Sequence, residues 1–161
     1  KSIYSKKTSF NPTNDYGKSK LKAEKLIIKS NCKFSILRFG GIYGKGGPSH
    51  LGINKFIDLA LKGKKLVFKG NKMSQRNYVF VEDAAKAVFN CLKYKKFGVF
   101  YLGGQIISFN LMLKKINKIL GKSKNITFIQ NNKKIDNQII NSNRLVKYTT
   151  FEKSLRLIKW N

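Results

Sequence analysis

A chain of 161 residues with 42% apolar content is long enough for one packed domain, which excludes a disordered protein. The net charge of +27 comes almost entirely from lysines spread along the whole chain, so we expect a solvated basic surface and no specific nucleic-acid partner. There is no apolar run of ~18 residues, no signal peptide and no metal-ligand cluster around the only histidine, so we expect a cytoplasmic protein without membrane or metal contacts.

The first half of the chain alternates between helical and extended patterns. Residues 16–30 are rich in good helix formers, and residues 33–39 form a short strand-like run that ends in the glycines of GGIYGKGGP. Apolar residues then recur at helical spacing over residues 53–65. The sequence KLVFKG, residues 65–70, predicts a second short strand.

The second half continues the same alternation. The predicted strands are NYVFV (77–81), GVFYLGG (98–104) and NITFIQ (125–130). The predicted helices are 82–94, which opens with two acidic residues, 108–122, which has a serine cap and a glycine end, and 149–160, which follows a threonine cap at Thr149 or Thr150.

Strands that alternate with helices predict an α/β protein with a mainly parallel sheet. Residues 131–142 are polar and weakly patterned, so they are the best candidate for a loop. Cys32 and Cys91 lack a CxxC spacing, and we expect two buried thiols in a reducing compartment.

Tyr16 and Lys20 lie four residues apart in the first predicted helix, and positions i and i+4 share one helix face. An ammonium beside a phenol would lower the tyrosine pKa from its usual ~10 and produce an acid–base group that works near neutral pH. The alternative is a partly buried tyrosine beside a solvated lysine. A YxxxK spacing alone is common and does not decide between the two.

The surrounding sequence resembles the NAD-dependent epimerase/dehydratase family, the extended short-chain dehydrogenases/reductases. NPTNDYGKSKLKAEKLI resembles the active-site helix of that family, with its YGxSK motif. ILRFGGIYGKGG is similar to LRxxNVYGPG. KFIDLALKGKKLVFKGNKMSQRNYVFVEDAAKAV is similar to a long segment with a GxGxQxRDFVYVxD core. GVFYLGG and TTFEKSLRLIKW resemble the YNVGG strand and the terminal helix.

The resemblance implies a role for several residues. Tyr16 would be the catalytic acid/base, and Lys20 would tune it and hold the nicotinamide-ribose hydroxyls of NAD or NADP. Phe39 would lie beside the nicotinamide. Arg76 would grip the diphosphate of a nucleotide-sugar substrate, the alternative being a surface ion pair with Glu82 or Asp83. Gly41 replaces an asparagine that helps to bind the phosphates in the family.

The resemblance also implies that the chain is the C-terminal portion of such an enzyme. The family begins with a strand, a GxxGxxG loop and a helix that bind NAD, and no such unit is expected here. The catalytic serine or threonine would fall just before Lys1, and Ser2 is a poor substitute. We therefore expect the 161 residues alone to bind no NAD tightly and to show no turnover, and the full-length form to be a homodimer.

The expected architecture is the C-terminal half of a Rossmann-type doubly wound parallel sheet with a small α/β substrate-binding lobe. Residues 1–45 and 75–105 would belong to the NAD-binding domain, and residues 46–74 and 106–161 to the lobe. The expected function is a nucleotide-sugar epimerase or dehydratase. The alternatives are a reductase of the same family and a non-catalytic basic binding protein.

Overall fold

The computed structural model describes residues 2–4, 10–121, 126–129, 134–143 and 145–160. Its helices are α1 (Asp15–Lys29), α2 (Gly52–Leu61), α3 (Val81–Lys93), α4 (Phe109–Ile119) and α5 (Phe151–Trp160). Its strands are β1 (Ser2–Tyr4), β2 (Ser35–Phe39), β3 (Gly41–Tyr43), β4 (Leu66–Lys69), β5 (Gln75–Phe80), β6 (Gly98–Leu102), β7 (Gln105–Ser108), β8 (Ile126–Ile129) and β9 (Gln138–Ile140).

Every helix and strand that the sequence predicts is present, with ends shifted by a few residues. Residues 122, 125, 130 and 131–133, which these predictions include, lie outside the described ranges. Two predicted helix caps are confirmed, because Ser108 accepts a hydrogen bond from the Leu111 amide and Thr150 accepts one from the Lys153 amide. Thr149 is not the cap, since it bonds to Asp83 instead.

The strands form three sheets. β2 pairs with β6, β4 pairs with β8, and the third sheet has the order β1–β9–β5–β3, all in parallel. Among the described strands, only β7 runs antiparallel to its partner, β5. The predicted α/β class with mainly parallel pairing is therefore confirmed.

Four short strands, β1, β3, β7 and β9, were not predicted from local sequence patterns. β3 begins at Gly41, inside the glycine-rich stretch that ends the predicted strand 33–39, and β7 follows Gly103 and Gly104, directly after β6. β9 lies inside residues 131–142, so the loop prediction is wrong at 138–140. These strands have three or four residues each, which is too short for a periodic pattern.

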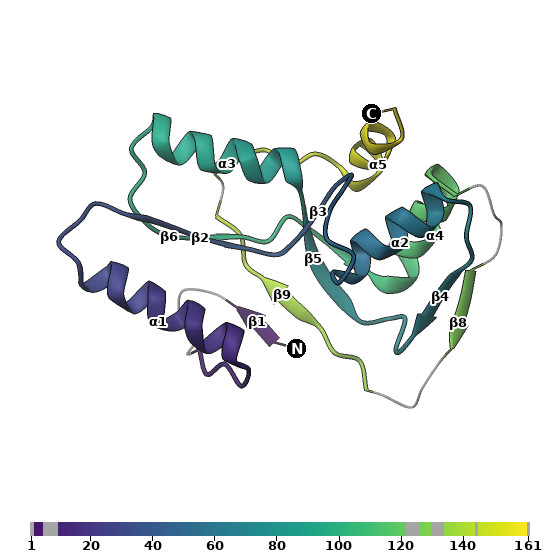
Figure 1. The fold of residues 1–161 in the computed structure, drawn as a ribbon, viewed down its shortest axis with the longest axis horizontal. Helices are drawn as coiled ribbons and strands as arrows, with labels where there is room; N and C mark the ends of the chain where they lie inside the picture. Colours follow the sequence, from purple (N-terminus) through teal and green to yellow (C-terminus); the bar gives the residue numbers. More distant parts are fainter. Residues whose placement is uncertain (1, 5–9, 122–125, 130–133, 144, 161) are drawn as a thin grey trace.

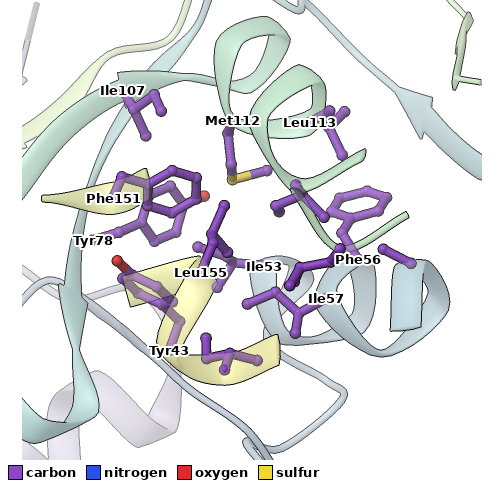
Figure 2. Close-up of a cluster of buried hydrophobic side chains, with 14 of the residues drawn as sticks. Tyr43, Ile53, Phe56, Ile57, Tyr78, Ile107, Met112, Leu113, Phe151 and Leu155 are labelled. Carbon is purple, nitrogen blue, oxygen red and sulfur yellow. The ribbon is translucent and has the colours of Figure 1, made fainter. Parts of the chain in front are cut away.

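Apolar side chains from distant segments form the main core (Figure 2). Tyr43 and Tyr78 extend from β3 and β5 toward α5, and α2 and α4 cover the remaining sides of the cluster (Figure 2). The fully buried members with the largest side chains are Ile57, Leu66, Met112, Leu113, Ile116, Phe151 and Leu155. This core fixes β3 and β5, and with them the residues at the start of β5.

Helices α1 and α3 lie on opposite sides of the β2–β6 pair (Figure 1). α3 buries Ala84, Ala87 and Cys91, whereas α1 has no buried residue. Cys91 is buried as predicted, and burial raises the pKa of its thiol, but Cys32 is exposed because it follows the last turn of α1. None of the helices in the described part of the chain is long and apolar enough to cross a bilayer.

Candidate functional site

The sequence before Tyr16 fixes the first turn of α1. The Asn14 side chain caps the helix by accepting a hydrogen bond of 2.7 Å from the Gly17 amide. A Cβ atom at Gly17 would lie 2.7 Å from the Pro12 Cβ, so only glycine fits against this proline. Pro12, Asn14 and Gly17 therefore fix the first turn of α1, from which the Tyr16 side chain projects.

Tyr16 and Lys20 lie on the same face of α1. The Lys20 ammonium is 5.5 Å from the centroid of the Tyr16 ring, and the Tyr16 side chain is 73% exposed. The Tyr16 hydroxyl makes no hydrogen bond to any residue that the structure describes, so its oxygen is accessible to a ligand. The predicted geometric relation between the two side chains is present.

Both side chains line a groove of about 730 Å³. The groove is lined by the segment 10–14, by α1 with Gly17, Leu21 and Glu24, and by Arg38 and Gln138. Gln138 belongs to β9, so the groove lies where α1 approaches the β1–β9 edge of the third sheet (Figure 1). This groove has the volume of a small-molecule binding site.

The other predicted residues lie in a second, smaller pocket of about 170 Å³. It is lined by Phe39, Gly40, Gly41, Arg76, Asn77, Gln138 and Ile140. Gln138 lines both the groove and this pocket, so the two hollows are neighbours. Tyr16 and Lys20 therefore line the groove together. Phe39, Gly41 and Arg76 line the smaller pocket together, apart from Tyr16.

Arg76 is held at the start of β5 by Asp136. Its Nη2 atom lies 2.7 Å from Asp136 Oδ2, and Nη1 donates to the carbonyl oxygens of Gln75 and Asp136. The guanidinium also lies 5.5 Å from the ring of Phe109. The predicted alternative, an ion pair with Glu82 or Asp83, is wrong, since Arg76 pairs with a residue sixty positions away.

Gly41 cannot be replaced by a larger residue without movement of a core side chain. A Cβ atom at this position would lie 2.9 Å from Cδ1 of Tyr78, whose ring belongs to the core. The absence of an asparagine here therefore has a local cause. A side chain at position 41 has no room beside Tyr78.

Glycines 41, 44 and 47 have the spacing of a GxxGxxG motif, which the sequence-based prediction overlooked. They do not form a phosphate-binding loop. Gly41 lies in β3, and α2 begins only at Gly52, so no helix N-terminus follows directly. The side chain of Asn54 fills the loop instead, because it accepts a hydrogen bond from the Gly44 amide and a Cβ at Gly47 would lie 2.5 Å from its Cγ.

Three site residues were missed from the sequence: Asn77, Asp136 and Gln138. Asn77 is only 5% exposed, and its Oδ1 accepts a hydrogen bond of 2.7 Å from the Ile140 amide, which joins β9 to β5. A polar residue at the start of the apolar run NYVFV was a usable signal for Asn77. No local pattern marks Asp136 or Gln138, which lie in the segment read as a loop.

Comparisons with known proteins identify the family and the fold of the chain. The profile of the NAD dependent epimerase/dehydratase family matches residues 1–103. The chain is 36% identical over 100 residues to dTDP-D-glucose 4,6-dehydratase of Dictyostelium discoideum, covering 59% of this chain and 23% of that protein. It is 30% identical over 131 residues to a trifunctional UDP-glucose 4,6-dehydratase/UDP-4-keto-6-deoxy-D-glucose 3,5-epimerase/UDP-4-keto-L-rhamnose-reductase of Arabidopsis thaliana, covering 74% of this chain and 19% of that protein.

Among solved structures, the UDP-N-acetylglucosamine 4-epimerase of Bacillus cereus superposes with a TM-score of 0.82 at 25% identity, over 98% of this chain and 56% of that one. The chain therefore spans about half of that enzyme and less than a quarter of the two curated relatives above. Since the family profile covers most of the sequence, the chain belongs to the NAD dependent epimerase/dehydratase family.

Proposed function

We propose that this chain supplies the acid–base pair and the substrate-gripping region of an NAD-dependent nucleotide-sugar epimerase or dehydratase. The observation that carries the proposal is the Tyr16–Lys20 pair on one helix face, with the ammonium 5.5 Å from the ring, at the wall of a groove of about 730 Å³. Three features coincide at Tyr16: a lysine four residues on, a capped first turn and a groove. Together they favour an acid–base role over a solvated surface tyrosine.

In this proposal, the Tyr16 hydroxyl exchanges a proton with a hydroxyl group of the sugar. Lys20 keeps a positive charge beside the phenol while the proton moves, and it donates hydrogen bonds to ribose hydroxyls of the cofactor. The cofactor, NAD or NADP, supplies the hydride acceptor and donor at the sugar carbon. The accessible Tyr16 hydroxyl and the neighbouring ammonium suit the nicotinamide-ribose portion of such a group.

Arg76 is proposed to bind the diphosphate of the nucleotide-sugar. The described hydrogen bonds of its guanidinium use Nη1 and one side of Nη2, and none of them uses Nε. The Nε–Nη2 edge can therefore form the paired hydrogen bonds that an arginine makes to phosphate oxygens. Phe39 and Gly41 would form the floor of this phosphate site, with Gly41 leaving room near Tyr78.

A reductase of the same family is the second candidate. The name of the Arabidopsis thaliana relative includes a reductase activity beside the dehydratase and epimerase activities. Both candidates use the same proton and hydride transfers and differ in whether the cofactor is regenerated within one cycle.

The experiment uses the longest coding sequence that contains these residues. The protein is incubated with NAD and either UDP-glucose or dTDP-glucose, and the products are identified by NMR. Epimerised or dehydrated sugar is the expected result. No conversion of either sugar, with the nicotinamide cofactor demonstrably bound, would overturn the epimerase/dehydratase assignment.

We further propose that residues 1–161 on their own bind NAD weakly and do not turn over. The side chain of Asn54 fills the loop that contains Gly44 and Gly47, so this loop does not offer the open amide cradle that a pyrophosphate needs. Titration of NAD into this chain, followed by calorimetry, tests the point. Micromolar binding would contradict it.

A further inference from the structure

Helix α1 carries the candidate acid–base pair but has an unusually weak apolar contact with the rest of the protein. None of its residues is buried, and the half-buried ones are Gly17, Leu21 and Glu24. By contrast, α2 buries five residues and α4 buries three. Since most helices in proteins are held by packing of an apolar face, another interaction has to hold α1.

The polar contact of α1 with the sheet is the pair of Glu24 and Arg38. Arg38 Nε lies 3.0 and 3.1 Å from the two carboxylate oxygens of Glu24, and Nη2 also donates to this carboxylate. The two side chains are only 18% and 21% exposed. A bidentate, largely desolvated ion pair is much stronger than the exposed pair of Lys62 and Asp58 on α2.

Arg38 connects this carboxylate to two further parts of the chain. Its guanidinium lies 4.1 Å from the ring of Phe10, in the segment before α1, and 5.1 Å from the ring of Tyr101, in β6. Nη1 also donates to the Tyr101 hydroxyl. The hydrogen bonds to Glu24 raise the pKa of Arg38, so this guanidinium stays charged. We call Phe10, Glu24, Arg38 and Tyr101 the Arg38 cluster.

We propose that Arg38 and Glu24 are positioning residues, which hold α1 and thereby keep Tyr16 and Lys20 at the wall of the groove. Glu24 follows Lys20 by four residues and Tyr16 by eight, so all three lie along one side of the helix, and all three line the same groove. The positioning role rests on the proposed function, but the attachment of α1 through this cluster can be measured without any activity.

The test measures amide hydrogen exchange over α1 and over α4 in the wild-type chain and in two variants. Glu24→Gln removes the charge at nearly constant shape, and Arg38→Lys keeps the charge but loses the planar fork. Asp58→Asn, which breaks the exposed pair on α2, is the matched control. We expect exchange over α1 to accelerate about tenfold or more in Glu24→Gln, and less in Arg38→Lys, with α4 and the control unchanged.

Unchanged exchange over α1 in both variants would overturn the proposal, and so would an equal acceleration over α4, which would indicate a general loss of stability. In the form of the protein that turns over nucleotide-sugars, both variants should lower kcat more than they raise KM. If the wild-type protein converts no nucleotide-sugar, the proposed function fails, whereas the exchange result alone still decides whether the Arg38 cluster holds α1.

Discussion

At the level of single residues, the site depends on side chains whose partners lie far away in the sequence. Arg76 is oriented by Asp136, and Asn77 joins β5 to β9 through the Ile140 amide. Only the guanidinium edge that Asp136 leaves open remains for an anionic ligand. The guanidinium itself supplies the positive charge of Arg76, whereas Asp136 sets the orientation of the side chain.

Replacement of Arg76 by lysine separates these two properties. The Arg76→Lys variant keeps the positive charge but loses the paired hydrogen bonds, so we expect the affinity for UDP to fall about tenfold. Calorimetric titration of UDP, in the form of the protein that binds nucleotide-sugars, measures the effect. Arg156→Lys, on the exposed side of α5, is the control, and an equal loss in both variants would contradict the role of Arg76.

Two buried tyrosines predict how stability depends on pH. Burial raises the pKa of Tyr78 to about 12, and burial likewise raises the pKa of Tyr43 above its usual range. Because the unfolded chain loses these protons first, at a pH of ~10, the stabilisation is complete below that pH and is lost as the pH rises toward the folded value. Each such tyrosine should contribute a loss of ~1.4 kcal/mol per pH unit in this window.

The measurement compares the melting temperatures of the wild type and of Tyr78→Phe between neutral and strongly alkaline pH. Above a pH of ~10 the wild type should lose stability relative to Tyr78→Phe, since phenylalanine has no proton to lose. A difference between the curves that does not change with pH would refute the assigned cause. Tyr94→Phe, at an exposed position, controls for the loss of a hydroxyl group.

At the level of elements, α5 is joined to β3 by a buried hydroxyl pair. Tyr43 is 2% exposed, and its hydroxyl oxygen lies 2.6 Å from Ser154 Oγ. Ser154 donates to the carbonyl of Phe151, so Tyr43 is the donor in the pair. Tyr43 belongs to the core that fixes β3 and β5 (Figure 2).

Removal of one partner of this pair should therefore destabilise the fold. Ser154→Ala leaves the Tyr43 hydroxyl without an acceptor, and we expect the free energy of unfolding to fall by ~1–3 kcal/mol. Adding Tyr43→Phe to this variant should cost less than Tyr43→Phe costs in the wild type, because the hydroxyl pair is then absent already. Urea unfolding of the four proteins tests this, and strict additivity would contradict it.

The elements also show what could be predicted from the sequence. The helices follow from periodicity and from caps such as Ser108 and Thr150, which act within a few residues. The short strands β3 and β9 are held by partners elsewhere in the chain, such as Asn77, so local patterns could not reveal them. Tyr16 and Lys20 were found because four residues suffice to put them on one face, whereas the Arg76–Asp136 pair joins residues sixty positions apart.

At the level of the whole molecule, the chain combines a packed apolar core with helix α1, which carries the candidate acid–base pair and has no buried residue (Figure 1). The division into an NAD-binding part and a substrate-binding lobe stays a prediction, as does a homodimer of the full-length form. The net charge of +27 keeps the surface solvated and attracts anionic ligands such as diphosphates. The two hollows share Gln138, so the proposed sugar and diphosphate sites would be neighbours.

The most direct test of the central claim follows the transient reduction of the nicotinamide by its absorbance during a single turnover, in the longest form of the protein that contains this chain. With NAD and a nucleotide-sugar present, the wild type should show hydride transfer, and Tyr16→Phe should lower its rate about a thousandfold. Tyr94→Phe should match the wild type. Retention of the full rate in Tyr16→Phe would contradict the assignment of the acid–base role to Tyr16.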